Sequence, residues 1–158
     1  MTTTTKAREL ERFIDSLGFR YIKGREFTPY WARVRRGVKN GVPPEALWPN
    51  IIKTAAVLDR FRHEFGAPVI LDSTYRRRAY NIAVGGAPGS FHLEFRAIDF
   101  HCVGPKRGTP EQWARRLEDL RGVEITLPGN RDRFHFAGGV GLYPTFVHVD
   151  TRGHDFSW

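Results

Sequence analysis

Apolar residues recur at helical spacing in two segments of the chain. In residues 6–17 and again in residues 45–65, hydrophobic side chains return every three or four positions. Each segment is followed by a glycine, Gly18 or Gly66, a residue that commonly ends helices. Pro49 falls within the opening turns of the second segment, so the regular part of that helix is expected to begin near it.

Two further segments have helical features, and one segment has no clear period. Thr109 is a suitable N-cap for a helix that carries Glu111 in its first turn and ends at Gly122. Residues 76–86 indicate a short helix or turn that ends at a glycine pair. Residues 19–43 mix aromatic, basic and glycine residues, and they are expected to be irregular.

Short runs rich in β-branched and aromatic residues predict the strands. These runs are residues 68–75, 95–102, 123–127, 133–138 and 145–152. Alternation in the second run places Asp99 and His101 on one face of the strand, with Phe100 on the other. In the last run it places His148 and Asp150 on one face, about 6 to 7 Å apart along the strand.

Composition bounds the organisation of the chain. A length of 158 residues with 41% hydrophobic content is enough for one substantial core, so a single domain is expected. The one cysteine, Cys102, excludes an intramolecular disulfide and a cysteine-rich zinc site. No stretch approaches the roughly 18 apolar residues that would span a bilayer, so no membrane span is expected.

Charge narrows the class of partner. Twenty-five Lys and Arg against seventeen Asp and Glu give a net charge of +8, which favours association with polyanions such as nucleic acid, anionic lipid or anionic cell wall. The arginines are scattered, and no helix-turn-helix or zinc-finger spacing accompanies them. Nucleic acid is therefore not the expected partner.

Three residues could carry metal chemistry. His92, Asp99 and His148 would supply two imidazoles and a carboxylate, which leave one tetrahedral position open for water, as catalytic zinc requires. Spacing alone does not decide this, because a chain with six histidines offers many such combinations. In the alternative interpretation His92 is a loop residue, Asp99 pairs with an arginine, and His148 is a half-buried strand residue.

A resemblance to a known family favours the metal site. Residues 90–99, SFHLEFRAID, resemble the Ser-x-His-x-x-Gly-x-Ala-x-Asp signature of zinc D-alanyl-D-alanine peptidases. Four of the five fixed positions match; Phe95 stands where the signature has glycine, which suggests a different local backbone. Residues 73–76 with 80–81 resemble the arginine-bearing strand end of the family, and residues 141–150 resemble the segment with its last zinc ligand.

The resemblance implies a fold and a cofactor. The fold would be of the hedgehog/DD-peptidase type, an α+β domain in which a small, mainly antiparallel sheet floors a zinc cleft with helices at its flanks. Residues 44–158 would form the family-like core of one domain, residues 1–158, and residues 1–43 would add an N-terminal helix and an irregular extension. His92, Asp99 and His148 would bind one zinc ion (Zn2+).

The resemblance also implies roles for residues beside the metal. Arg76 would be catalytic, because a fixed guanidinium can stabilise a developing oxyanion, and it would also bind substrate. Ser90 and Tyr75, which lie in the matched motifs, would bind substrate as well.

The general base is less clear in the sequence. Better-known members place an acidic residue three positions before the last histidine or a histidine two positions before it, and here those positions hold Thr145 and Phe146. Asp150 is the nearest replacement as a catalytic residue. It could equally be an acceptor that orients an imidazole. His101 and His135 are fallbacks.

The implied activity is zinc-dependent hydrolysis of a peptide bond in bacterial peptidoglycan, by a D,D-carboxypeptidase or a murein endopeptidase. The alternative is a non-catalytic zinc module of the same fold. The first residues lack the apolar core of a secretory signal, which favours a phage or prophage lysin released through a holin or carried in the virion. A periplasmic bacterial enzyme whose leader has been removed is the other setting.

Overall fold

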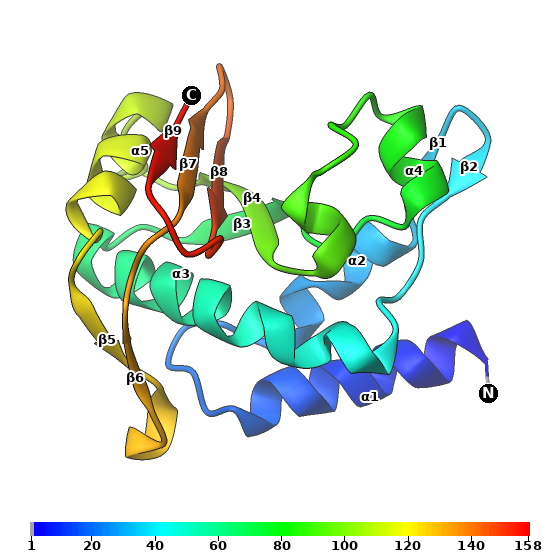
Figure 1. The fold of residues 1–158 in the computed structure, drawn as a ribbon, viewed down its shortest axis with the longest axis horizontal. Helices are drawn as coiled ribbons and strands as arrows, with labels where there is room; N and C mark the ends of the chain where they lie inside the picture. Colours follow the sequence, from blue (N-terminus) through cyan, green and yellow to red (C-terminus); the bar gives the residue numbers. More distant parts are fainter. Residues whose placement is uncertain (1) are drawn as a thin grey trace.

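The structure is a computed structural model that describes residues 2–158 of the chain. Its largest sheet has five strands (Figure 1). The strand order is β3-β4-β8-β7-β9, and every pairing is antiparallel except that of β7 with β9. The strands are β3 (Val69–Ser73), β4 (Ala97–Cys102), β7 (Gly139–Leu142), β8 (Val147–Asp150) and β9 (Phe156–Ser157). The fold is α+β with a small, mainly antiparallel sheet, as predicted.

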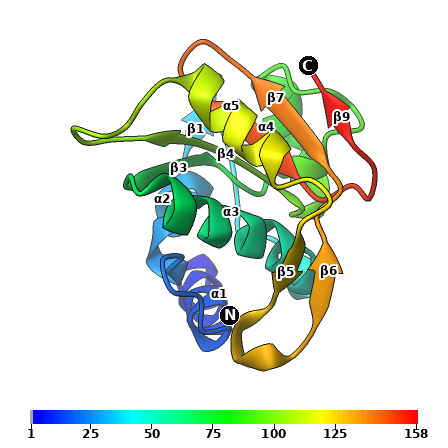
Figure 2. The same cartoon turned by 90° about the vertical axis from the view of Figure 1, so that its left-hand side faces the viewer.

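Helices cover one face of this sheet. They are α3 (Ile51–Phe65) and α5 (Pro110–Asp119), and the ring of Phe61 in α3 packs on Phe100 of β4 with 5.1 Å between centroids. Helix α1 (Thr3–Ser16) lies on the far side of α3 from the sheet (Figures 1 and 2). Because side chains alternate along a strand, the opposite face of β4 and β8 is left for polar residues.

The helix ends follow local sequence signals. Pro49 lies in a 3-10 helix, η2 (Glu45–Asn50), and α3 begins directly after it and ends at Gly66, whose φ is 76°. Thr109 caps α5 in a capping box with Gln112. The short helix α4 (Arg78–Ala83) lies where residues 76–86 predicted it.

The segment between the predicted strands 133–138 and 145–152 forms a strand of its own. It supplies β7, between β8 and β9. A Cβ at Gly139 would lie 2.5 Å from a carboxylate oxygen of Asp150, and one at Gly141 would lie 2.6 Å from the ring of Trp158. Glycine is therefore required there because side chains from neighbouring strands cross close to the backbone.

Residues 19–43 are more ordered than the sequence indicated. They form η1 (Gly24–Glu26), α2 (Thr28–Trp31) and a hairpin of β1 (Val34–Arg35) and β2 (Val38–Lys39). Phe27 and Trp31 belong to the same hydrophobic core as α3 and the sheet. Packing against this core orders residues 19–43. Their helices and strands are too short to show a hydrophobic period in the sequence.

A second hairpin lies beside α3. It consists of β5 (Glu124–Thr126) and β6 (Arg133–His135), joined through the 3-10 helix η4 (Pro128–Asn130), and it forms a separate two-stranded sheet (Figure 2). Both strands were predicted.

Phe95 occupies the signature position that usually holds glycine, and its φ of 55° lies in the left-handed region. Glycine adopts this conformation without strain, whereas other residues pay about 1 to 2 kcal/mol. The ring is fully buried and meets Phe27 and Tyr75 edge-on. The phenylalanine therefore keeps a backbone conformation that suits glycine and offsets the strain by packing, so the substitution does not require the change in local backbone that the sequence suggested.

Two substitutions at this position should separate strain from packing. Phe95→Ala is expected to destabilise the protein by about 3 to 5 kcal/mol, because it leaves a cavity and keeps the strain. Phe95→Gly leaves a similar cavity but relieves the strain, so it should be about 1 kcal/mol more stable than the alanine variant. Urea unfolding of both variants measures the difference. Equal stabilities would show that the left-handed backbone at residue 95 is unstrained.

Cys102 should be chemically inert in the folded protein. Its side chain is buried in β4, and burial raises the pKa of the thiol to about 12. Because the thiolate is the reactive form, iodoacetamide at pH 8 should leave the native protein unlabelled. In denaturant, mass spectrometry should find one label per chain. Fast labelling of the native protein would show that β4 opens readily.

Candidate metal centre

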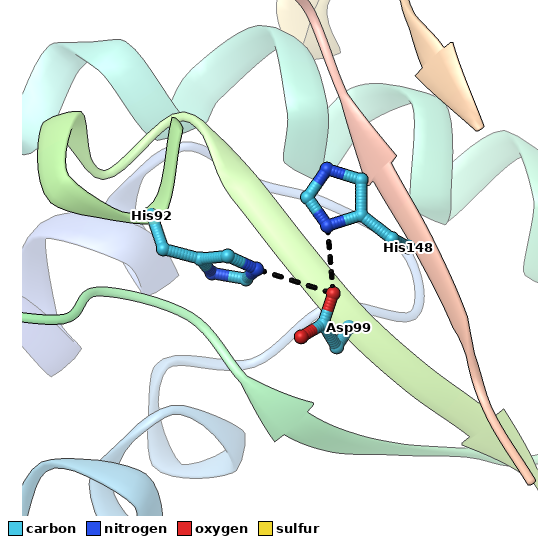
Figure 3. Close-up of side chains that lie close together, drawn as sticks. All are labelled: His92, Asp99 and His148. Atoms are coloured by element: carbon cyan, nitrogen blue, oxygen red, sulfur yellow. Dashed lines mark hydrogen bonds and ion pairs between the residues drawn. The ribbon is translucent and has the colours of Figure 1, made fainter. Parts of the chain in front are cut away.

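Three elements bring the predicted ligands together. His92 lies in the 3-10 helix η3 (Phe91–Glu94), where the side chain of Ser90 accepts a hydrogen bond from the His92 amide. Asp99 lies in the middle of β4, and the antiparallel register places His148 of β8 directly opposite it. Figure 3 shows both imidazoles directed at the Asp99 carboxylate. The strand alternation read from the sequence put Asp99 and His148 on this face.

The three side chains have the separations that one metal ion needs. Asp99 Oδ1 lies 3.1 Å from His92 Nε2 and 2.8 Å from His148 Nδ1. The three candidate ligand atoms lie within 4.8 Å of one another, and all three residues are buried. Ligands of one tetrahedral zinc ion lie roughly 3.3 Å apart, given zinc–ligand distances near 2.0 Å. Small movements would accommodate the ion.

The state of His92 fits a metal ligand. Its Nδ1 donates a hydrogen bond to the carbonyl oxygen of Thr74, so in the neutral ring Nε2 carries a lone pair. That Nε2 is buried and has no hydrogen-bond partner, although it faces the carboxylate of Asp99. Burial lowers the pKa of His92 more than Asp99 raises it, which favours the neutral ring. The lone pair of His92 Nε2 and the Asp99 carboxylate therefore face each other in a buried site, an arrangement that a cation bound between them would stabilise.

The two ring nitrogens of His148 have different roles: one faces the candidate metal site, and the other makes a hydrogen bond that fixes the ring. Nδ1 faces Asp99, and Nε2 donates to Asp150 Oδ2 at 2.8 Å. Burial lowers the pKa of His148, but its hydrogen bonds to Asp150 and Asp99 outweigh burial and raise it. The Nδ1 proton lies where a metal would bind, so metal binding would release it.

Asp150 is fully buried, and both of its oxygens are occupied. Arg152 makes two contacts with the carboxylate, Nε to Oδ1 at 2.9 Å and Nη2 to Oδ2 at 2.7 Å. The amide of Gly139 donates to Oδ1 as well. Although burial raises it, the hydrogen bonds from Arg152 and His148 hold the pKa of Asp150 well below its ordinary value. The sequence left two roles open for Asp150, general base or acceptor that orients the His148 ring. The occupied oxygens favour the second role.

Arg76 lies against the other oxygen of Asp99. Its Nη2 is 3.1 Å from Asp99 Oδ2, while Nε donates to Ser73 Oγ at 3.1 Å and Nη1 to Asn81 Oδ1 at 3.3 Å. Burial raises the pKa of Asp99, but its two histidine neighbours, including the hydrogen bond from His148, together outweigh burial and lower it, so the carboxylate stays ionised. The guanidinium is thus fixed beside the candidate ligands with part of its surface open.

A cleft runs over the site. Two cavities, each of about 510 Å³, meet at a shared wall and together form it. The residues common to both cavities are Arg76, Val84, Asp99 and Phe146. One end contains His92, His148 and aromatic side chains that include Tyr143, Phe156 and Trp158. The other end is lined by Tyr30 and three arginines, Arg33, Arg35 and Arg36.

Comparison with known families assigns the chain to a peptidase family. The family model described as Peptidase M15 matches residues 20–150, a range that contains His92, Asp99 and His148. The chain belongs to the Peptidase M15 family. The predicted relationship to the zinc D-alanyl-D-alanine peptidases is thereby confirmed. A search of curated proteins finds no match.

Membership in this family implies a metallopeptidase that acts on peptide bonds. M15 peptidases are generally zinc-dependent. The donor set of this M15 chain, two imidazole nitrogens and one carboxylate, suits zinc with a position left for water. In the part of the chain that the structure describes, no helix combines the length and hydropathy needed to cross a membrane.

The remaining predicted residues of this M15 chain lie in different places. Ser90 lines the cleft and caps η3, whereas the ring of Tyr75 is buried in the core against Phe95, which does not support a substrate contact. His101 follows Asp99 on the same face of β4 and pairs with Asp72 at 2.8 Å. His135 lies in the separate β5–β6 hairpin.

Two residues that the sequence analysis did not single out complete the site. Arg152 anchors Asp150, and Trp158 lies beside His148 with 5.0 Å between ring centroids. The alternation that places residues 148 and 150 on the cleft face also points to residue 152. No local signal marks Trp158, because its position depends on the pairing of β9 with β7.

Proposed function

We propose that this M15 chain is a zinc-dependent peptidase with a hedgehog/DD-peptidase-type fold that hydrolyses a peptide bond in bacterial peptidoglycan. The observation that carries the proposal is His92 Nε2, a buried nitrogen without a hydrogen-bond partner that faces the ionised carboxylate of Asp99. A buried imidazole lone pair that faces a carboxylate is unfavourable unless a cation joins the two groups.

The proposed ligands are His92 Nε2, an oxygen of Asp99 and His148 Nδ1. Zinc held there would supply a Lewis acid that lowers the pKa of a water molecule and polarises the scissile carbonyl. The chain supplies the orientation. Thr74 fixes the ring of His92 through Nδ1, and Asp150 fixes the ring of His148 through Nε2.

Arg76 is proposed to bind the carbonyl oxygen of the scissile bond as negative charge develops on it. Its contacts with Ser73, Asn81 and Asp99 hold the guanidinium before substrate arrives, so little reorganisation is needed during the reaction. Its place on the wall shared by both cavities puts it at the middle of the cleft.

Asp150 is proposed as a positioning residue. Asp150→Asn breaks the paired contact with Arg152 and weakens the acceptor for His148, so zinc affinity should fall about 10- to 100-fold. If Asp150 only orients His148, saturating zinc should restore most of the cleavage rate. Zinc titration against a chromogenic chelator, with rates measured at each zinc concentration, checks both expectations.

The matched control is Asp155→Asn, an exposed carboxylate near the same end of the chain, which should leave zinc affinity unchanged. A rate that stays low when Asp150→Asn is fully loaded with zinc would instead make Asp150 the general base.

A non-catalytic zinc module is the second candidate. Among the described residues that line the cleft, Asp72 is the one carboxylate besides Asp99, and it is already paired with His101. A ready proton acceptor beside the ligands is the feature that a peptidase would need and a binding module would not.

Digestion of purified peptidoglycan decides between the two candidates. Zinc-loaded protein should release new amine termini, a chelator should stop the release, and added zinc should restore it. Mass analysis of the fragments then identifies the bond. If zinc-saturated protein releases no amine termini, the enzyme proposal fails and the binding module is retained.

We further propose that the enzyme acts in degradation of the wall, as a phage or prophage lysin or as a remodelling enzyme. The net charge of +8 supports attraction to an anionic wall.

A further inference from the structure

The β1–β2 hairpin supplies a basic end to the cleft that the proposed chemistry does not use. Arg33, Arg35 and Arg36 line the cavity on the side away from Tyr143, Phe156 and Trp158, and Arg76 lies on the wall shared with the cavity that contains His92 and His148. All three hairpin arginines are exposed. The hairpin lies beside α4 at one end of the molecule (Figure 1).

The base of the hairpin is fixed next to Arg76. Asn40 is buried and donates through Nδ2 to the carbonyl oxygen of Tyr75 at 2.9 Å, while its Oδ1 accepts from the amide of Arg77 at 3.1 Å. Arg33 donates to the carbonyl oxygen of Asp72 at 3.1 Å. These contacts tie the hairpin to the end of β3 and to the segment that follows it, so its arginines are held over the cleft rather than left on a free loop.

The turn holds an arginine in an unfavourable conformation. Arg36 and Gly37 have φ values of 48° and 74°, the positive pair that a two-residue type I′ hairpin turn requires. Asparagine or glycine would suit the first position, and arginine there costs on the order of 1 kcal/mol. Turn geometry therefore does not explain why residue 36 is an arginine. A requirement for positive charge at the tip of the hairpin would explain it.

The charge at this end of the cleft is not neutralised by the protein. None of the ion pairs among the described residues involves Arg33, Arg35 or Arg36. The acidic residues that line this cavity are Asp72 and Asp99, and both already have partners. An anion entering from solvent would meet positive charge without a competing carboxylate.

We propose that Arg35 and Arg36 form a subsite for a free carboxylate of the peptide substrate, separate from the carbonyl contact of Arg76. The subsite rests on the proposed function, and it makes the enzyme selective for acidic stem peptides over those whose carboxylates are amidated. Guanidinium groups suit this role because they bind carboxylates with two parallel hydrogen bonds.

The test uses zinc-loaded protein and two probes, a peptidoglycan stem peptide with free carboxylates and the same peptide with its carboxylates amidated. The double variant R35Q/R36N removes two charges and installs Asn-Gly, the sequence that favours this turn, so the hairpin should keep its shape. The control is R115Q/R116Q, which removes two neighbouring charges from the exposed face of α5, in a different cavity.

Isothermal titration measures binding of both peptides, and cleavage rates are measured in parallel. The wild type and R115Q/R116Q should prefer the free acid by about tenfold, which corresponds to about 1.4 kcal/mol, and R35Q/R36N should lose that preference. High ionic strength should reduce the preference in the wild type, since an exposed subsite is screened. Equal affinity of the wild type for both peptides, or an unchanged preference in R35Q/R36N, would overturn the subsite.

The two proposals fail in different ways. Binding with the expected preference but without cleavage would overturn the enzyme and support the subsite. Cleavage of both peptides with equal efficiency would support the enzyme and overturn the subsite.

Discussion

His148→Ala is expected to abolish zinc binding and to reduce peptidoglycan cleavage by at least about 10³-fold, since catalysis by the bound metal is lost with its ligand. The variant loses Nδ1, which lies 2.8 Å from Asp99 Oδ1, and it also leaves Asp150 without its histidine partner. Two protein ligands then remain where catalytic zinc needs three. Zinc content by elemental analysis should fall from one per chain to near zero.

Stability provides a second measurement for this prediction. Ligand that binds only the native state stabilises it by about 4 kcal/mol at a thousandfold excess over Kd, so zinc should raise the melting temperature of the wild type. It should leave that of His148→Ala unchanged. The matched control is His135→Ala, an exposed histidine in the β5–β6 hairpin that should keep one zinc ion and full activity. A His148→Ala protein that retains stoichiometric zinc would remove His148 from the ligand set.

Arg76→Ala should lower kcat by about 10²- to 10³-fold while zinc stays bound, the usual cost of removing one preorganised donor to a developing oxyanion. The guanidinium is held by Ser73, Asn81 and Asp99, so its loss leaves a gap at the middle of the cleft. Arg76→Lys keeps the charge but not the planar fork, and it should recover only part of the rate. Steady-state kinetics with zinc content measured on the same samples checks the prediction.

The control for this prediction is Arg78→Ala, an exposed arginine two residues further along that should behave as the wild type. If Arg76→Ala loses zinc in proportion to activity, Arg76 acts by holding Asp99 and not by binding the substrate carbonyl.

The predicted helices and strands show where local signals suffice. The cap of α5 at Thr109 and the end of α3 at Gly66 follow from single residues and their immediate neighbours. The alternation of β4 fixed which face carries Asp99, because side chains on a strand point to opposite sides in turn. Such features depend on a few consecutive residues, and the sequence contains all of them.

Elements that depend on distant partners were missed. The segment that forms β7 contains two glycines, which disfavour a strand by propensity. It is a strand because β8 and β9 pair with it on both sides. The helix and hairpin within residues 19–43 have no period long enough to detect, and Phe27 and Trp31 are ordered by the shared core. Contacts of this kind appear only when the chain has folded.

The candidate metal centre divides in the same way. Residue types and strand alternation were enough to predict the candidate ligands and the strand faces of Asp99 and His148, and the motifs carried the resemblance that the family match confirmed. The folded chain was needed to show that His92 Nε2 is buried without a hydrogen-bond partner beside the Asp99 carboxylate, and that both oxygens of Asp150 are occupied. The reason is physical: residue type and alternation are local properties, whereas burial and hydrogen-bond pairing are set by segments far apart in the chain.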